Sequence, residues 1–380
     1  MNQSELAAHN EERKAFNDLA RSFARKELLD HVHEHEYPYF RTVSGIVETA
    51  REAGLFSINL PLDWGGTGLR APALAGIMKE ISTVDAGMAA MLFTHAAALE
   101  LIAVAADTAE DRCRTICQLV SEPDTIPLAY QSYTAPEEME LPDVSGESTC
   151  LMSGKLPLLA LGGMARYAVS AGARQKDGEF SYYLIDLSGD GIPKSDSILT
   201  MGFQACQAVD VTLNNVPALL IGAEGNGQSY FRKMQSRMSL PASAISLGIM
   251  EGSFKEALAY SGQRWQGNRT IVEWSAVRMK LAEMAVQIDV ARSCLSGISS
   301  AFDAASTEGT GSAVAAAIHI SDMACMVASE GVQVLGGNGY MKDYGQEKRM
   351  RDARQARSLL GMNGLKKMNY IERIIEEADL

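Results

Sequence analysis

The sequence predicts an α+β protein in which a helical region, a β-rich region and a second helical region follow one another along 380 residues. Apolar residues first recur at helical spacing, as at Phe16, Leu19, Ala20 and Phe23. Short β-rich runs then alternate with Gly, Asp and Pro, and long amphipathic stretches return from Phe231 onward. Because no linker or low-complexity segment separates the three regions, we expect one compact assembly.

The two changes of pattern divide the chain into three predicted domains. Residues 1–124 are expected to form an N-terminal α-helical domain, and residues 125–232 a middle β-domain. Residues 233–380 are expected to form a C-terminal α-helical bundle, because long amphipathic stretches follow one another there. For a chain of this length, two or three units that share an extensive core are the usual organisation.

Charge and composition restrict the classes of partner. The formal net charge is -13, with 34 basic and 47 acidic residues, which argues against a nucleic-acid or anionic-membrane surface. The first residues show no apolar core flanked by basic residues, and no window is expected to supply the roughly 18 apolar residues of a membrane span. Small molecules and other proteins are therefore the expected partners.

The cysteine pattern favours reduced thiols. No two cysteines have Cys-x-x-Cys spacing, and most lie among apolar residues, which suits packed thiols better than a disulfide framework. We therefore expect a cytoplasmic protein. The cysteines are Cys113, Cys117, Cys150, Cys206, Cys294 and Cys325.

Three segments, in order along the chain, carry a family resemblance. The first, Ala50 to Leu69, has a Pro and a Gly-Gly-x-Gly turn after an expected helix end. The second, Met201 to Phe231, and the third, which runs from Gln333 and begins QVLGGNGY, follow at the spacing of a middle and a C-terminal domain. Together they resemble the acyl-CoA dehydrogenase family, and three ordered matches are more specific than one glycine motif. The resemblance implies that the C-terminal helical region is a four-helix bundle.

The resemblance implies a reaction that needs a base. Family members bind FAD and an acyl-CoA thioester, remove the α-proton with a carboxylate and pass the β-hydrogen to the flavin as hydride. The usual base position, one turn beyond the MRDA motif, holds Leu360 here, before Gly361. The position that some members use instead offers Arg237, Met238 and Ser239. Since leucine and methionine cannot accept a proton, we expect no catalytic residue at either place.

The residues that the resemblance places against the flavin ring also depart from the family pattern. Tyr133 stands where a small hydroxyl residue is usual, and the Gly-Ser-Asp end of that strand is absent. Leu158 and Ala160 replace the aromatic residue and the hydroxyl residue of a second strand. A flavin ring would lose a stacking partner and a hydrogen bond there.

The adenine and pyrophosphate half of the cofactor site is the opposite case. In the family this half is lent to an FAD held mainly by a neighbouring subunit, through an Arg and a glycine-rich run. One departure is that Gly267 and Asn268 replace the Phe-Gly that follows the Arg. The residues that match are Arg264, Gln333, Gly336, Gly337, Asn338 and Gly339.

This combination resembles the non-catalytic subunit of heterotetrameric acyl-CoA dehydrogenases. The resemblance implies an α2β2 tetramer, in which FAD is shared with a homologous catalytic subunit that handles the acyl-CoA substrate. Two alternatives stay open. The chain is a complete FAD enzyme with an atypical base, such as Glu100 or Glu273, or it is a flavin-free acyl-CoA-binding protein on the same fold.

Plainer interpretations exist for several of these residues. A Gly-Gly-Asn-Gly turn after a helix is also typical of a C-cap, and Arg264 also suits an ordinary surface position. His31, His33 and His35 are expected at a solvated helix end rather than in a metal site, because helical spacing spreads them around the axis. His95, in an apolar helix, is expected to be a hydrogen-bonded core residue.

Overall fold

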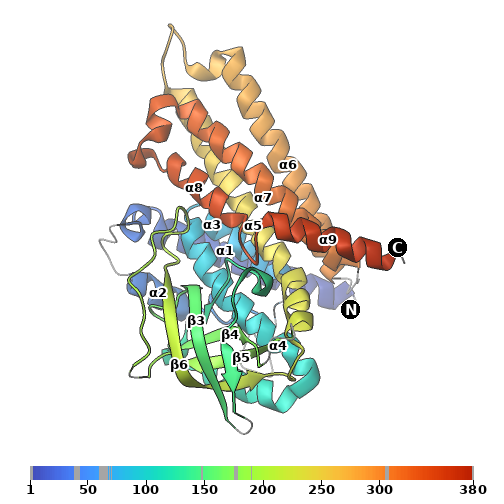
Figure 1. Cartoon of the computed structure of the whole chain (residues 1–380). Coiled ribbons are helices and arrows are strands. Elements are labelled where there is room, and N and C mark those ends of the chain that lie inside the picture. The colour runs from blue at the N-terminus through green and yellow to red at the C-terminus, as the bar shows by residue number, and fades with distance from the viewer. Residues whose placement is uncertain are drawn as a thin grey trace.

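The structure is a computed structural model that describes residues 3–378, apart from 38–42, 60–66, 68, 70, 147–148, 175–178, 190 and 304–307. Helices come first, a sheet follows and helices return, so the predicted α+β class is confirmed (Figure 1). The boundaries after residues 124 and 232 stay proposals. Most of the first predicted motif, the Gly-Gly-x-Gly turn, lies outside the described residues.

The N-terminal region is built around one long buried helix. Helices α1 (Gln3–Phe23), α2 (Val43–Glu52) and α3 (Ala71–Ser82) precede α4 (Ala86–Val120). Asp85 caps α4, because its Oδ1 accepts hydrogen bonds from the backbone N–H groups of Gly87 and Met88 at 2.9 and 3.4 Å. The first half of α4 is apolar on every side and almost wholly buried, which is typical of a helix at the centre of a protein.

The middle region is a six-stranded sheet that closes on itself. The strands are β1 (Ala129–Tyr130), β2 (Asp143–Ser145), β3 (Cys150–Ala160), β4 (Tyr167–Gly172), β5 (Ser181–Asp186) and β6 (Ala208–Ile221), in the order β1-β4-β5-β6-β3-β2. Strand β1 also pairs with β3, through Tyr130 and Ala160, so that five strands form a ring. This closure brings the ends of β1 and β3 to one place.

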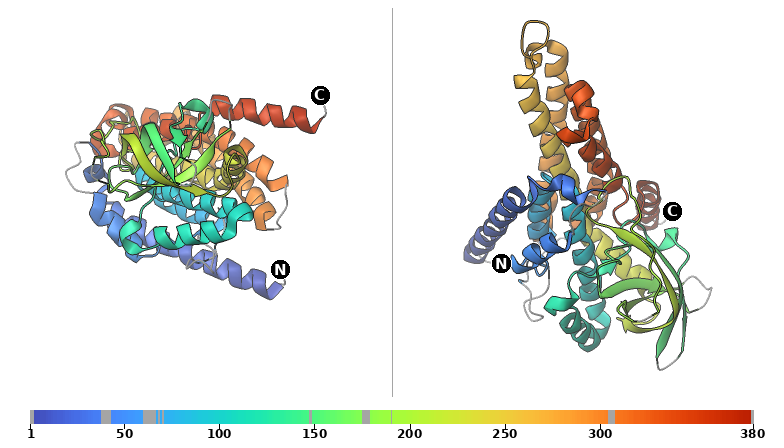
Figure 2. Two further views of the ribbon diagram at one scale, coloured as in Figure 1. Left: turned by 60° about the horizontal axis from the view of Figure 1, so that its bottom comes forward. Right: turned by 90° about the vertical axis from the view of Figure 1, so that its left-hand side faces the viewer.

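The C-terminal region is a long helical bundle. Helix α5 (Gly227–Gln263) runs from the β-domain to the tip of the bundle, where η6 (Ile271–Glu273) leads into α6 (Ser275–Asp303). Helix α7 (Glu308–Leu335) returns to the tip, followed by η7 (Gly336–Tyr340), η8 (Lys342–Tyr344) and α8 (Gln346–Ala356). Figure 2 shows the bundle projecting beyond the rest of the molecule, while α9 (Asn363–Glu377) extends sideways to the C-terminus.

Two helical segments pass a length and composition test for membrane spans, so the prediction that no window is apolar enough is wrong. They are Ala86–Val120 and Gly311–Tyr340, whose most apolar windows are 89% and 67% buried inside the protein. Their burial explains the apolar composition, because core helices pass the same test. The cysteines are free thiols, and four of the six are buried.

A buried cluster of charges joins the N-terminal helices to α8. Lys348 Nζ lies 3.0 Å from Asp85 Oδ1 and 2.6 Å from Asp352 Oδ2. Burial favours the neutral amine, but Asp352 and Asp85 outweigh it and raise the pKa of Lys348. His35 is buried with Nδ1 3.5 Å from Asp85 Oδ2, so the solvated position expected for it is wrong. Among the described residues no cluster of metal-ligating side chains occurs.

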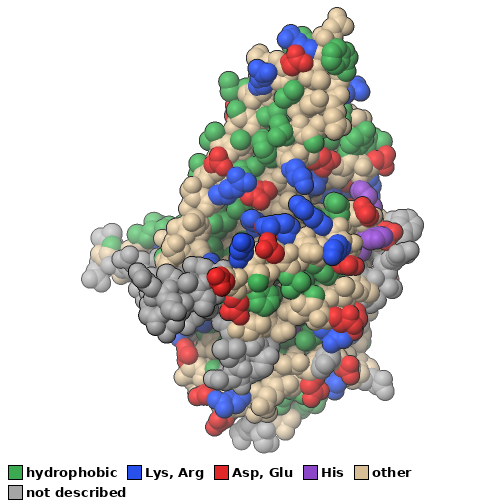
Figure 3. Space-filling view, turned by 180° about the vertical axis from the view of Figure 1, so that it is seen from behind, with side chains coloured by type: hydrophobic (Ala, Val, Ile, Leu, Met, Phe, Trp, Pro, Cys, Tyr) green, Lys and Arg blue, Asp and Glu red, His purple; other side chains and the backbone are tan. Residues whose placement is uncertain are grey.

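The face opposite to that of Figure 1 carries charges of both signs. Lys and Arg side chains gather across the middle of this face, with Asp and Glu among them (Figure 3). Ion pairs between separate helices of the chain include Arg21 with Glu80 and Arg292 with Glu251. Such mixed, partly paired surfaces do not provide the uniform positive field that nucleic acids require.

Candidate functional site

Three distant segments meet where β1 and β3 end. Ala160 pairs with Tyr130, and the backbone N–H of Leu360 donates a 2.7 Å hydrogen bond to the carbonyl of Ser132. The Leu360 carbonyl in turn accepts a 2.9 Å bond from Gln235 Nε2 of α5. The fold thus brings together Ala160, Leu360 and Tyr133, the residue that follows Ser132. These are positions that the family resemblance assigns to the flavin ring and the base.

Leu360 is part of the core at this junction. Its side chain is 1% exposed, and its backbone has φ of 58°, a left-handed conformation that is uncommon for a leucine. Gly361 follows with φ of 106°, and a Cβ there would lie 3.0 Å from that of Ala135. The turn is therefore packed closely against the β-domain, and its central side chain is apolar.

One carboxylate beside this turn, that of Glu138, is not predicted from the sequence. Glu138 accepts hydrogen bonds from the backbone N–H groups of Ala135 at 2.8 Å and Met362 at 2.9 Å. Oε1 thus joins the β-domain to the turn that contains Leu360, whereas Oε2 bonds a backbone N–H three residues earlier in the β-domain. No local pattern marks this residue, because Met362 is 224 positions away in the sequence.

Tyr133 is buried, and its own polar group is satisfied. Its hydroxyl donates to the Cys206 carbonyl at 3.1 Å, and its ring lies 6.3 Å from that of Phe203. Burial raises the pKa of Tyr133 well above its usual value, and burial raises the pKa of Cys206 to about 11. Near neutral pH both groups are protonated, so neither is the missing base.

The second ring-facing strand offers no replacement for the lost contacts. Leu158 has φ of 48°, and its backbone N–H donates to Asp210 Oδ1 at 2.9 Å. Ala160 is buried within the strand pairing. An aliphatic side chain and a methyl group cannot donate a hydrogen bond. The residues around this position therefore do not fit the family's way of holding a flavin ring.

The residues at the alternative base position make structural contacts. Arg237 Nη1 lies 2.7 Å from Glu100 Oε1, Met238 is buried, and the Ser239 hydroxyl donates to the carbonyl of Gln235. Glu100 is thus the ion-pair partner of the residue at the second base position. Its carboxylate is therefore engaged in a contact between α4 and α5.

Glu273 and His95 also have clear structural roles. Glu273 Oε1 accepts from the backbone N–H and the hydroxyl of Thr270, in η6 at the tip of the bundle, away from the β-domain. His95 Nε2 donates to the Phe56 carbonyl at 2.9 Å, and its Nδ1 accepts from the Leu128 N–H at 3.0 Å. These two bonds and its burial confirm the predicted hydrogen-bonded core histidine, and burial lowers the pKa of His95 to about 4.

The glycine-rich run lies at the tip of the bundle, next to the end of α5. Asn338 Nδ2 donates to the hydroxyls of Tyr260 and Tyr344 at 3.0 and 3.1 Å. Tyr260 belongs to the last turn of α5, and its carbonyl accepts from the backbone N–H of Arg264 at 2.8 Å. Asn338 therefore has a structural role and fixes the glycine run beside Arg264.

The side chains at this tip are turned to solvent. Arg264 and Gln333 are exposed, and among the described residues neither has a polar side-chain partner. Gly337 has open space where a Cβ would lie, whereas a Cβ on Gly339 would collide with the Val332 carbonyl. Packing within the chain thus explains Gly339 but not Gly337. An exposed Arg beside an open glycine backbone suits a phosphate group.

Two family models match most of the chain. The model "Acyl-CoA dehydrogenase, N-terminal domain" matches residues 10–121, and "Acyl-CoA dehydrogenase, C-terminal domain" matches residues 225–375. The chain belongs to the acyl-CoA dehydrogenase family. The two matched regions flank the β-domain, so the acyl-CoA dehydrogenase architecture extends over the described chain, and the predicted resemblance is confirmed.

Individual members of the family are similar over nearly the full length. Cyclohex-1-ene-1-carbonyl-CoA dehydrogenase of Syntrophus aciditrophicus is 24% identical over 94% of this chain and 88% of its own. The structure of butyryl-CoA dehydrogenase from Megasphaera elsdenii has a TM-score of 0.84, at 21% identity, over 96% of this chain and 98% of its own. The FAD-complexed acyl-CoA dehydrogenase of Bacillus anthracis has a TM-score of 0.85, at 20% identity, over 97% of this chain and 67% of its own.

Proposed function

We propose that this chain is the non-catalytic subunit of an FAD-dependent acyl-CoA dehydrogenase. It lends the adenine and pyrophosphate half of an FAD site to a homologous catalytic subunit, in an α2β2 tetramer that desaturates an acyl-CoA thioester between its α and β carbons. The observation that supports this most is the contrast between the junction around Leu360 and the tip of the bundle around Arg264. Leu360 is buried where the base would be needed, whereas Arg264 is exposed at the position proposed for the pyrophosphate.

The residues at the tip would perform the binding step. The Arg264 guanidinium would pair with pyrophosphate oxygens, and the backbone N–H groups of Gly336 and Gly337 would approach them closely. Gln333, one turn earlier on the same side, would donate its amide hydrogens. When bound, the FAD would accept the β-hydrogen of the substrate as hydride. The partner subunit would supply the carboxylate base. The names of the relatives support a CoA thioester as the substrate class.

A complete enzyme with an atypical base is the second candidate, and Glu138 is the residue that favours it. Its carboxylate lies at the turn that contains the usual base position. Against this, both oxygens already accept backbone N–H bonds, so the carboxylate is engaged in structural contacts. A flavin-free acyl-CoA-binding protein is the third candidate, which the exposed tip residues do not favour.

Anaerobic bleaching of the flavin by butyryl-CoA distinguishes the candidates. The chain is co-purified with a family member from the same genome that keeps the glutamate. We expect Leu360→Ala in this chain to leave bleaching unchanged, and substitution of the partner's glutamate by glutamine to abolish it. Bleaching of a flavin bound to this chain alone, lost on Glu138→Gln, would instead establish the second candidate.

A further inference from the structure

A small cavity lies where the first turns of α5 and α7 face α9. Its volume is about 110 Å³, several times the roughly 10–15 Å³ that one water molecule needs. Phe231 of α5 and Val314 of α7 give the cavity an apolar side, and Lys366 lines it from the start of α9. The cavity thus combines one amine with room for a short apolar chain.

Lys366 is a buried amine without a carboxylate partner. It is 6% exposed, and no carboxylate among the described residues forms an ion pair with it. Its Nζ donates to the Arg357 carbonyl at 3.2 Å and to Asn363 Oδ1 at 3.4 Å. Charged N–H donors usually lie closer to their acceptors, at about 2.7–2.9 Å from an anion. Two distant neutral acceptors therefore stabilise an ammonium group only weakly.

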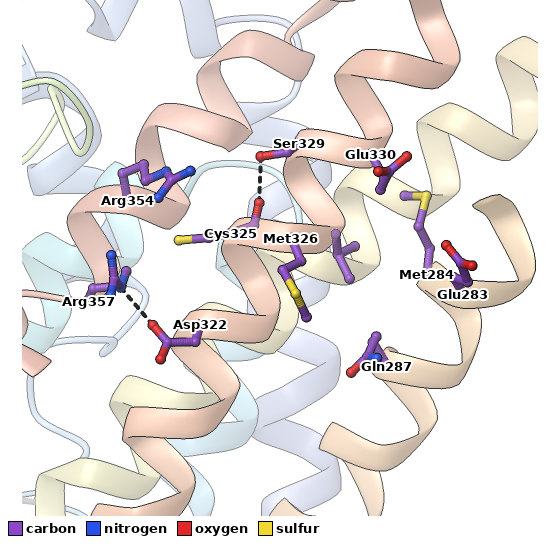
Figure 4. Close-up of a pocket in the computed structure, with 11 residues that line it drawn as sticks. Glu283, Met284, Gln287, Asp322, Cys325, Met326, Ser329, Glu330, Arg354 and Arg357 are labelled. Carbon is purple, nitrogen blue, oxygen red and sulfur yellow. Dashed lines mark hydrogen bonds and ion pairs between the residues drawn. The ribbon is translucent and has the colours of Figure 1, made fainter. Parts of the chain in front are cut away.

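The nearby carboxylates are engaged in other contacts. Asp322 of α7 pairs with Arg357 at 2.8 Å (Figure 4), and Glu138 accepts two backbone N–H bonds. Lys366 also lies in the first turn of α9, where the free N–H groups of a helix disfavour a cation. The position of Lys366 in the fold thus favours the neutral amine.

The protonation of Lys366 follows from these surroundings. Burial and the charge of Arg357 lower the pKa of Lys366 to about 8, although Glu138 and Asp322 act in the opposite direction. At pH 8 about half of this side chain is the free amine, compared with less than about 1% of an ordinary exposed lysine. A desolvated free amine is an activated nucleophile.

We infer that Lys366 is a site of covalent acylation by a short acyl thioester; the choice of this acyl donor rests on the proposed function. The nitrogen forms a bond with the thioester carbonyl carbon, the C–S bond breaks, and the proton lost from nitrogen passes to the departing thiolate. An amide and a free thiol result, without an oxidant or a further reactant. The acyl chain then lies against Phe231 and Val314, and a buried amine without an anionic partner is removed.

Peptide mass spectrometry after incubation of the chain with butyryl-CoA at pH 8 tests this inference. The chain is purified alone, so the result depends on neither a partner nor FAD. We expect butyrylation of Lys366 to be at least about tenfold faster than that of Lys367, the exposed neighbour on α9, with release of an equal amount of free CoA. Lys366→Arg should abolish this fast reaction, whereas the matched control Lys367→Arg should keep it. Circular dichroism checks the folding of both variants.

The pH dependence of the two rates gives a second readout. The rate at Lys366 should level off above about pH 8, whereas the rate at an exposed lysine should rise by about tenfold per pH unit up to about pH 10. In urea the burial is lost, so the two lysines should react alike. The other titratable and charged groups that line the cavity are Glu137, Arg232, Tyr370, Glu372, Arg373 and Glu376.

Three results would overturn the inference. The first is equal butyrylation of Lys366 and Lys367 in the folded chain, or none at Lys366. The second is a preference for Lys366 that persists in urea, because the local sequence and not the cavity would then cause it. The third is acetylation by acetyl phosphate without any transfer from butyryl-CoA, which would exclude a thioester as the donor. The FAD content of the co-purified pair, in contrast, tests only the proposed function.

Discussion

Single residues decide which chemical step this chain lacks. Leu360 occupies the base position with an apolar side chain, and Tyr133 fills the ring position with a buried phenol whose hydrogen bond is already made. The Cys206 thiol, in the residue that Tyr133 contacts, is protonated near neutral pH, since burial raises its pKa to about 11. The loss is therefore distributed over several side chains, and one substitution should not restore it.

Leu360→Glu tests that statement. The new carboxylate would be buried in a packed junction, so we expect the free energy of unfolding to fall by about 2–4 kcal/mol, with no flavin reduction by butyryl-CoA. Urea unfolding and anaerobic absorbance spectra measure the two effects. A Leu360→Glu variant that is as stable as the wild type and reduces flavin on its own would show that the site is intact apart from its base.

His95 predicts a loss of stability in acid. Its folded-state pKa of about 4 lies below the ordinary value of roughly 6.5, so the unfolded chain binds the proton more readily between these values. The contribution is complete above pH 6.5 and is lost as the pH falls toward 4, by on the order of 3 kcal/mol.

Urea unfolding between pH 4 and 7 measures this loss. His95→Gln should flatten the slope of stability against pH, whereas His319→Gln, at an exposed position of α7, should not. The same slope in wild type and His95→Gln would assign the acid sensitivity to other groups.

At the scale of elements, two glycines of the turn after α7 have different roles. Gly339 is needed for packing, and Gly337 is proposed to contact the FAD. Gly339 has no room for a Cβ because of the Val332 carbonyl, while Gly337 has open space. We therefore expect Gly339→Ala to lower the free energy of unfolding by about 1–3 kcal/mol. Gly337→Ala should change it by less than about 0.5 kcal/mol and still lower the FAD content of the pair. Equal FAD loading in the Gly337→Ala pair and the wild-type pair would show that Gly337 is not part of the proposed FAD site at the tip of the bundle.

The elements and their order could be predicted from the sequence, whereas several contacts of the site could not. Helical spacing and the ordered motifs pointed to the α+β class and to Leu360 and Arg264, because those signals are local. Glu138 could not be found, since its partner Met362 lies 224 residues away. His35 was misplaced for the same reason, because its burial depends on Asp85 at the start of another helix.

Across the whole molecule, Lys348 links regions that are far apart in the sequence. It lies between Asp85, the cap of α4, and Asp352, which accepts from the Phe203 N–H of the β-domain at 2.7 Å. Lys348→Met would leave two buried carboxylates without their cation. We expect a fall of about 3–5 kcal/mol in the free energy of unfolding.

Thermal and urea unfolding check the Lys348→Met prediction, with Lys367→Met at an exposed position of α9 as the control. The control should remain within about 0.5 kcal/mol of the wild type, since exposed ion pairs contribute little. A small effect of Lys348→Met would show that the three regions hold together without this cluster.

The flavin absorbance per chain tests the central claim most directly. The chain is purified alone and then with its glutamate-bearing homologue. Our account predicts a colourless chain that gains about one FAD per pair, because each shared site needs both subunits. One FAD bound per chain in the absence of any partner would contradict it.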